Sequence, residues 1–301
     1  MSHNHHHGHN HDHSKDVKNI KVAFFLNLSF TVIEIIGGIL TNSVAILSDA
    51  VHDFGDSLSL GLAWYFQKLA KKGKTKSFSY GYKRFSLIGA VINCIVLIVG
   101  SIFILSEAIP RIFSPQETHA GGMFLLAIFG VVVNGAAVFR LRKGSSINEK
   151  VVSLHLLEDV LGWAAVLVGS VIMYFFDLPI IDPILSIGIA CFVLFNVFRN
   201  MRQTLRIILQ GIPEDIDAEH IIEHIEKLEN VENVHDLHIW SMDGEYNVLT
   251  AHVTLKKVCP MEKLAELKAE IHLLLVQEQI QHATIEFETP DEQCNFKKSC
   301  G

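Results

Sequence analysis

The stretch that decides the fold class is Phe85–Ile109, which reads FSLIGAVINCIVLIVGSIFILSEAI and carries one charged side chain, Glu107. A helix needs roughly 20 mostly apolar residues to cross the hydrocarbon core of a membrane, and this stretch is long enough to do so. We therefore expect a transmembrane helix here.

Five other stretches on either side have a similar length and apolar character, namely Ile20–Leu40, Val44–Phe66, Gly122–Leu141, Val151–Phe175 and Ile180–Phe198. Val44–Phe66 and Val151–Phe175 contain several charges, so hydropathy supports them less than the others. Their length, their glycines and their position between clear spans keep them in the set. The pattern favours an α-helical membrane protein with six transmembrane helices over a soluble helical bundle.

Basic residues indicate the orientation of these helices. They lie before the first span, in the second-to-third and fourth-to-fifth connections and after the sixth span, for example at Lys18, Lys74, Lys143 and Arg202. The opposite side has Arg111 alone. The positive-inside rule therefore predicts a multi-pass protein of the cell (inner) membrane with both termini in the cytoplasm.

The last part of the chain has a different composition. Residues 211–301 carry 7 Lys and Arg against 19 Asp and Glu, which is typical of a soluble acidic domain. Such a domain repels nucleic acid and concentrates cations, so we expect no nucleic-acid partner.

The segment Gln210–Pro213 marks the end of the membrane part. After it the patterns predict, in order, a helix, two strands, a helix and a strand, at Glu214–Leu228, Val234–Ser241, Tyr246–Leu255, Met261–Gln279 and Ala283–Phe287. This αββαβ order indicates a small α+β, ferredoxin-like domain. We therefore divide the chain into a His-rich tail (1–16), a transmembrane domain (17–210), a cytoplasmic domain (211–290) and a Cys-containing tail (291–301).

Two charged pairs stand inside the predicted membrane helices. His52 precedes Asp56 by four residues in the second span, and His155 precedes Asp159 by four residues in the fifth. Residues four apart lie on one helix face. A charge at the centre of a bilayer costs at least about 2.5–3.5 kcal/mol, so such groups face a cavity or a partner. One pair alone can be a hydrogen-bonded structural pair, whereas two pairs indicate a site.

A bound cation is the simplest partner for these groups. Two imidazoles and two carboxylates supply the N and O ligands that suit tetrahedral zinc and that cobalt or cadmium also accept. An all-carboxylate set would suit manganese or magnesium better, and neither pair contains the thiol that copper(I) prefers. We therefore predict a transition-metal site at His52, Asp56, His155 and Asp159.

Acidic neighbours surround this predicted site. Asp49 and Asp53 fall within about 100° of arc of His52 and Asp56, so they are candidate path or proton-carrying groups. Capping near the membrane surface is an equal interpretation for Asp49. Glu158 points about 60° away from the face of His155 and Asp159 and is a weaker candidate for the same path.

Several short motifs resemble the cation diffusion facilitator family, in particular its bacterial zinc, cadmium and cobalt efflux members. They run through nearly the whole chain after the His-rich tail: Glu34-Ile-Ile-Gly-Gly, Thr41-Asn-Ser-Val-Ala-Ile-Leu-Ser-Asp-Ala, His52-x-x-x-Asp56, Tyr80-Gly-Tyr-Lys-Arg, His155-x-x-x-Asp159, Asp182-Pro-Ile and Val234-His-Asp-Leu-His-Ile-Trp240. One position departs from the family pattern, because the residue after the first site histidine is usually apolar and is Asp53 here.

The resemblance implies a transport site formed by the two pairs, proton-coupled export of zinc-like ions by alternating access, and a cytoplasmic domain that binds regulatory metal and dimerises. Its regulatory ligands correspond best to His235, His252, His282 and Glu288, the last two with a less clear spacing. His235 and His238, three residues apart, are expected on opposite faces of one strand. His220, His224 and His272 are interpreted as surface residues of amphipathic helices.

Proton coupling also has a chemical reason. Metal binding needs neutral imidazole and ionised carboxylate, so protons and metal compete for the same atoms. The chain has no G-x-x-x-x-G-K-[ST] loop, and we expect no cofactor and no enzymatic activity. A membrane metalloenzyme and a metal sensor that transports nothing are the alternatives. The choice between proton and potassium as counter-ion stays open.

Both ends of the chain carry further candidate ligands. Seven histidines stand within the first 13 residues, a composition that binds metal loosely and cannot pack a core. We interpret this tract as a metal-gathering tail rather than an expression tag. Cys294 and Cys300 form either a further thiol site or a free tail.

Overall fold

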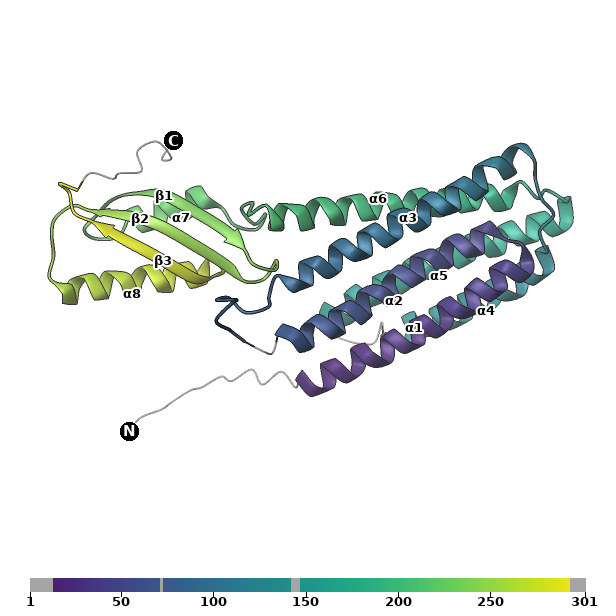
Figure 1. The fold of residues 1–301 in the computed structure, drawn as a ribbon, viewed down its shortest axis with the longest axis horizontal. Coiled ribbons are helices and arrows are strands. Elements are labelled where there is room, and N and C mark those ends of the chain that lie inside the picture. Colours follow the sequence, from purple (N-terminus) through teal and green to yellow (C-terminus); the bar gives the residue numbers. More distant parts are fainter. Residues whose placement is uncertain (1–12, 71–72, 142–146, 293–301) are drawn as a thin grey trace. The chain divides into compact units, whose positions relative to one another are not determined.

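The structure, a computed structural model, describes residues 13–70, 73–141 and 147–292, with side chains for 23–66, 68–69, 73–139 and 156–292. The described part forms eight helices and three strands (Figure 1). The chain divides into two compact units, residues 1–71 with 89–201 and residues 72–88 with 202–301.

Six long helices make up most of the first unit: α1 (His13–Thr41), α2 (Val44–Ala70), α3 (Phe85–Phe113), α4 (Ala120–Leu141), α5 (Ile147–Phe176) and α6 (Ile181–Ile208). Five of them contain stretches that are long and apolar enough to cross a membrane, at Ala23–Thr41, Phe85–Phe113, Ala120–Phe139, Leu156–Phe176 and Ile181–Ile208. These five agree with five of the predicted spans. Helix α2 does not reach this apolarity because Asp49, His52, Asp53 and Asp56 lie on it.

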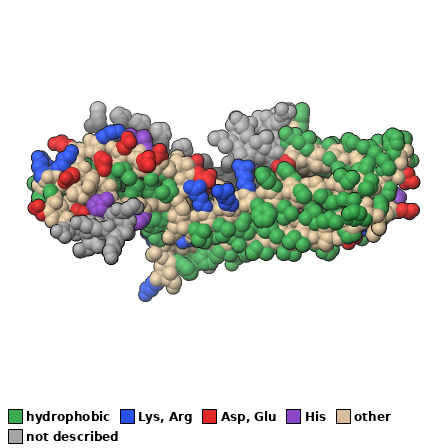
Figure 2. Space-filling model, turned by 90° about the horizontal axis from the view of Figure 1, so that it is seen from above, with side chains coloured by type: hydrophobic (Ala, Val, Ile, Leu, Met, Phe, Trp, Pro, Cys, Tyr) green, Lys and Arg blue, Asp and Glu red, His purple; other side chains and the backbone are tan. Residues whose placement is uncertain are grey.

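Large apolar side chains cover the outside of these helices. Leu40, Phe113 and Leu125 are 77%, 83% and 68% exposed, and Figure 2 shows hydrophobic side chains over most of the visible face of the helical unit. A soluble protein rarely exposes a continuous apolar surface of this extent. A hydrocarbon environment accounts for this surface, because apolar side chains can face lipid tails. Helices are suited to that environment, since they satisfy their own backbone hydrogen bonds.

The helices pack in two groups around α2. Helices α1, α2, α4 and α5 contact one another in pairs, with Ala45, Met123 and Trp163 buried between them. Helices α3 and α6 pack together and against α2 through Val44, Ile104 and Ala190. Helix α2, which carries Asp49, Asp53 and Asp56, is therefore covered by apolar neighbours on both sides, and this places its polar side chains inside the unit.

A carboxylate from α6 holds the start of α2 in place. Asp182 is fully buried and accepts a hydrogen bond from Ser43 Oγ (2.5 Å) and from the backbone N–H groups of Val44 (2.8 Å) and Ala45 (3.2 Å). The first N–H groups of a helix lack partners within the helix, and a carboxylate near them also interacts favourably with the helix dipole. Asp182 therefore fixes the position of α2 relative to α6.

The second unit contains a three-stranded sheet with two helices. Its elements are α7 (Ala218–Glu226), β1 (Val231–Ser241), β2 (Asn247–Leu255), α8 (Met261–Gln277) and β3 (Ile280–Glu288), which confirms the αββαβ order. Strands β1 and β2 pair antiparallel, and β2 and β3 pair parallel. Both helices bury residues such as Ile221 and Ile271 against alternate residues of β2, including Leu249 and Ala251.

A bulge in β1 changes the side-chain pattern expected from the sequence. His235 pairs with His252, and His238 pairs with Thr250, so three steps on β1 match two on β2. Asp236 has a positive φ of 48° at this irregularity. Because one extra residue enters the strand, His235 and His238 lie on the same face, and the prediction of opposite faces was wrong.

Replacing Asp182 by Ala should destabilise the helical unit. The change leaves buried donors of Ser43, Val44 and Ala45 without their acceptor, which costs about 2–3 kcal/mol of unfolding free energy. Thermal unfolding of purified protein in detergent should show a lower midpoint for Asp182→Ala. The control is Asp177→Asn, which changes an exposed carboxylate just before α6. Equal midpoints for the two variants would contradict this role of Asp182.

Candidate metal centre

One imidazole and two carboxylates meet between α2 and α5. His52 Nε2 lies 3.7 Å from Asp56 Oδ2 on the next turn of α2 and 3.9 Å from Asp159 Oδ1 on α5. The three side chains are 17%, 26% and 11% exposed, respectively. The structure thus brings together three of the four side chains that the two H-x-x-x-D pairs predict. A cation placed among them would satisfy their charge in a region with little water.

The fourth predicted ligand, His155, lies in α5 one turn before Asp159, but its side chain is outside the described residues. The i, i+4 spacing puts His155 and Asp159 on the same face of α5. Its part in the site stays a prediction from the sequence.

A cavity of about 440 Å³ adjoins these groups. Its polar lining consists of Asp49 and His52 from α2 and Glu158 and Asp159 from α5. Apolar residues of α5 and α6, including Leu161, Ile189 and Phe192, form the rest of its wall. Polar groups that converge in a mostly apolar cavity are typical of a ligand site. Asp49 and Glu158 therefore line the space that leads to the candidate ligands.

Gly162 makes room for this arrangement. A Cβ atom at this position would lie 3.6 Å from Asp49 Oδ1, which is ordinary van der Waals contact. An alanine would fit there, but a longer side chain would extend into the cavity that Gly162 lines. The small residue keeps α2 and α5 close while leaving the space between their carboxylates open.

Asp53 occupies a different position from Asp49. Asp53 is buried, and its ligand atom lies within 4.8 Å of those of His52 and Asp56. It also lies near the buried carboxyl group of Glu34 on α1. Asn27 of α1 donates to the Asp53 carbonyl (3.0 Å) and to Ser57 Oγ (3.2 Å). In the sequence, Glu34 stands only in a short family motif of the first span, and nothing there links it to the candidate site.

A second set of candidate ligands lies on the sheet of the second unit. His235 and His252 are paired across β1 and β2, and Glu288 ends β3 beside them. Glu288 Oε1 lies 2.7 Å from His252 Nδ1, and Glu288 Oε2 lies 3.2 Å from His235 Nε2. Three of the four predicted cytoplasmic ligands thus converge, with all three ligand atoms within 4.8 Å of one another.

His282 does not join this group. His282 pairs with Val248 of β2. It stands six residues before Glu288 on β3, and six residues span about 20 Å along a strand. Its ring instead contacts the Tyr80 ring at 5.7 Å between centroids. Two acids that the sequence did not suggest as ligands lie close to His252 instead. Asp236 and Glu286 have carboxylate oxygens 3.7 and 3.6 Å from His252 Nε2.

The two tails carry the remaining ligands that the sequence predicts. The first 12 residues, which hold six of the seven N-terminal histidines, and Cys294 and Cys300 lie outside the described residues, as does the side chain of His13.

The helices and the polar side chains define a class of protein: a multi-pass membrane protein with a candidate cation site beside a cavity between its helices. Family comparison agrees. Residues 20–209 match the cation efflux transmembrane domain, and residues 213–289 match the cation efflux protein cytoplasmic domain. The chain belongs to the cation efflux, or cation diffusion facilitator, family. Members of this family are transporters, which sets aside the metalloenzyme interpretation.

Curated relatives match the chain over most of its length. A cadmium, cobalt and zinc/H(+)-K(+) antiporter of Bacillus subtilis is 35% identical over 96% of this chain and 92% of its own. The metal cation efflux system protein CzcD of Cupriavidus metallidurans is 33% identical over 92% and 89%. The zinc transporter ZitB of Escherichia coli is 31% identical over 96% and 93%.

Filling the cavity at Gly162 should stop transport without removing a ligand. Gly162→Leu places a side chain in the cavity that Asp49 and Asp159 also line, whereas Gly162→Ala adds only one ordinary contact. We expect zinc uptake into proteoliposomes to fall at least about tenfold for the leucine variant, because overpacking displaces neighbouring groups. The alanine variant should stay near wild type.

Gly135→Leu on α4 is the matched control, since a Cβ atom there meets nothing within 4 Å. Normal transport by Gly162→Leu would show that the cavity lies off the ion path.

Proposed function

We propose that this chain exports zinc, and also cadmium or cobalt, from the cytoplasm in exchange for protons, by alternating access of a site formed by His52, Asp56, His155 and Asp159. The observation that carries this proposal is the convergence of His52, Asp56 and Asp159 beside a cavity within apolar helices. Ionisable groups in such a place are expensive, and a transported cation offsets that cost.

The ligand types support zinc-like ions. Imidazole nitrogen and carboxylate oxygen are common zinc ligands, and four of them complete a tetrahedral site. The names of the relatives from Bacillus subtilis and Escherichia coli include zinc, and that of the first also includes cadmium and cobalt. Asp53, near His52 and Asp56, offers a further carboxylate that can alter the ion preference.

Proton exchange follows from competition at the same atoms. A histidine that binds zinc must be neutral, and protonation of His52 or His155 therefore displaces the ion. Access from a more acidic side favours metal release, and access from the cytoplasm favours metal binding. A proton gradient can then drive export without nucleotide hydrolysis. The name of the Bacillus subtilis relative includes H(+) and K(+) as exchanged ions, so potassium needs a separate test.

We also propose that α2 is a sixth transmembrane helix, despite its charges. It is 27 residues long and is covered by α1, α3, α5 and α6 through buried contacts, so its polar face need not meet lipid. Six spans bring both termini to one side, and the basic connections favour the cytoplasmic side of the cell (inner) membrane. The transmembrane domain then comprises residues 17–210.

For residues 211–290 we propose a ferredoxin-like cytoplasmic domain that binds regulatory zinc and forms a homodimer. The parallel β2–α8–β3 unit supports this fold. His235, His252 and Glu288 form the zinc site, with Asp236 and Glu286 next to His252. Zinc is then both a substrate and a regulatory ligand, and no other cofactor is needed.

Removing a ligand of the transport site should abolish exchange. In proteoliposomes with an acidic interior, wild-type protein should take up external zinc, while His52→Ala and Asp159→Asn should lose at least about 99% of the rate if each removes about 3 kcal/mol of ion binding. The apparent zinc affinity of wild type should fall as the pH on the binding side falls, because protons occupy the ligands.

His272→Ala is the control, since it removes a histidine of α8 that belongs to neither proposed site. A purified protein that moves no zinc under a proton or potassium gradient would contradict the transporter proposal. Full transport by both ligand variants would place the ion path elsewhere.

The zinc site on the sheet is separable from transport. Glu288→Gln removes the carboxylate that lies closest to both His235 and His252, so zinc at this site should bind at least about tenfold more weakly. His282→Ala should leave that affinity unchanged, because His282 lies elsewhere on β3. Zinc titration of the full-length protein under chelator-buffered conditions measures both. Equal losses in the two variants would restore His282 as a ligand.

A further inference from the structure

Helix α7 presents two histidines on one face. Asp217 caps its start by accepting hydrogen bonds from the backbone N–H groups of Glu219 and His220. Ile221 and Ile225, four residues apart, are buried against the sheet. His220 and His224 precede them by one residue each and therefore share a neighbouring, more exposed face. The packing of α7 thus sets the direction of both imidazoles.

A carboxylate from another part of the domain faces these histidines. Glu278 follows α8, and its backbone N–H donates to Leu274 O (3.1 Å), while the N–H of Gln279 donates to Val276 O (3.2 Å). The next residue, Gln279, has a φ of 61° and its carbonyl accepts a hydrogen bond from Asn247 Nδ2 (3.0 Å). Glu278 therefore stands at a fixed turn between α8 and β3.

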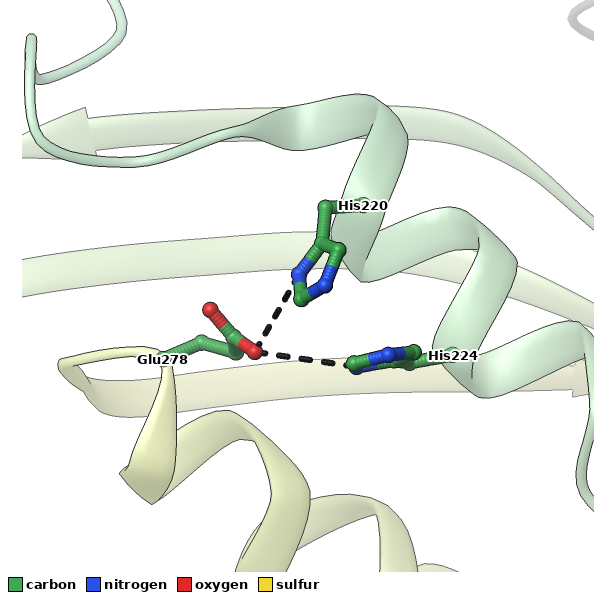
Figure 3. Close-up of side chains that lie close together, drawn as sticks. All are labelled: His220, His224 and Glu278. Carbon is green, nitrogen blue, oxygen red and sulfur yellow. Dashed lines mark ion pairs between the residues drawn. The ribbon is translucent and has the colours of Figure 1, made fainter.

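The three side chains converge on one point, as Figure 3 shows. Glu278 Oε1 lies 3.4 Å from His220 Nδ1 and 3.7 Å from His224 Nδ1. The two imidazole centroids are 3.9 Å apart with an interplanar angle of 56°. All three ligand atoms lie within 4.8 Å of one another, so small side-chain rotations would bring each to the roughly 2.0–2.2 Å at which zinc is bound.

We propose that His220, His224 and Glu278 form a separate zinc-class metal site that joins α7 to the junction of α8 and β3. Two imidazoles and one carboxylate suit zinc or cobalt, and a three-ligand set leaves one coordination position for water or another ligand. The side chains are 48%, 37% and 27% exposed, so an ion can reach them from solvent.

This site is distinct from the one at His235, His252 and Glu288. His252 alternates along β2 with Ala251 and Val253, which face the core beneath α7 and α8. His252 therefore points to the opposite face of the sheet. The proposed site involves the helix layer, and none of its three residues belongs to the other group.

The position of Glu278 directly after α8 adds an electrostatic contribution to cation binding at the proposed site. The carboxyl end of a helix carries a partial negative charge, which attracts a cation. Glu278 stands at that end and adds a full charge beside two neutral nitrogen donors. A bound ion would link α7, near the start of the domain, to the junction of α8 and β3, near its end. The position of α7 would then depend on metal concentration.

The alternative is an ion pair between protonated histidine and Glu278 with no metal. The two interpretations differ in their response to zinc, and histidine modification with diethyl pyrocarbonate measures that response at each residue. Full-length protein in detergent is treated with the reagent with and without zinc ions, and the rates for His220, His224 and His272 are read by mass spectrometry.

Zinc at ten times its dissociation constant leaves a site free for about one-tenth of the time, so His220 and His224 should both react about tenfold more slowly. His272 on α8, outside the group, is the internal control and should react at the same rate with and without zinc. Glu278→Gln should remove the protection of both histidines, and His224→Gln should remove it from His220.

Circular dichroism and size exclusion establish that each variant is folded before its rates are compared. Unchanged rates for His220 and His224 in the presence of zinc would overturn the proposal. Protection that persists in folded Glu278→Gln would also overturn it as a three-ligand site. The transport assay is independent of these outcomes, since none of the three residues lies in the transport site.

Discussion

Burying carboxyl and imidazole groups among apolar helices raises the free energy of the protein unless a cation or protons accompany them. Helix α2 carries Asp49, His52, Asp53 and Asp56 within three helical turns, and α5 adds Asp159. Such a charge density cannot face lipid. The helices around α2 therefore serve to cover this polar face, and the cavity beside it provides the place where a compensating ion can enter.

The frame around the site is held by contacts that allow little adjustment. Asp182 on α6 binds the first residues of α2 through Ser43, Val44 and Ala45. Gly130 on α4 lets Trp163 of α5 approach so closely that a Cβ atom there would meet the indole at 2.2 Å. These contacts fix α2 and α5 relative to α6 and α4. A metal site needs this precision, because its ligands must stay within a few tenths of an ångström of a common centre.

Regular periodicity explains what the sequence could predict. Apolar runs of about 20 residues revealed five of the helices, and the four-residue spacing of His52 and Asp56 predicted their shared face. These features depend on local chain geometry alone.

Features that depend on irregular backbone or on distant packing could not be predicted in this way. The bulge at Asp236 reversed the expected face of His238. This bulge depends on one residue with positive φ, which the alternation of side chains along a strand does not indicate. Glu278 meets His220 and His224 only because α7 and α8 pack on the same face of the sheet, and no sequence spacing indicates that contact. Glu34 approaches Asp53 through helix packing, which is equally non-local.

The proposed transport mechanism depends on an ion that binds between α2 and α5. Diffraction from crystals grown with zinc, recorded on both sides of the zinc absorption edge, locates the bound metal directly. Zinc bound in this site gives an anomalous peak about 2.0–2.2 Å from His52 Nε2 and from carboxylate oxygens of Asp56 and Asp159. Zinc peaks confined to the sheet domain at saturating zinc would contradict it.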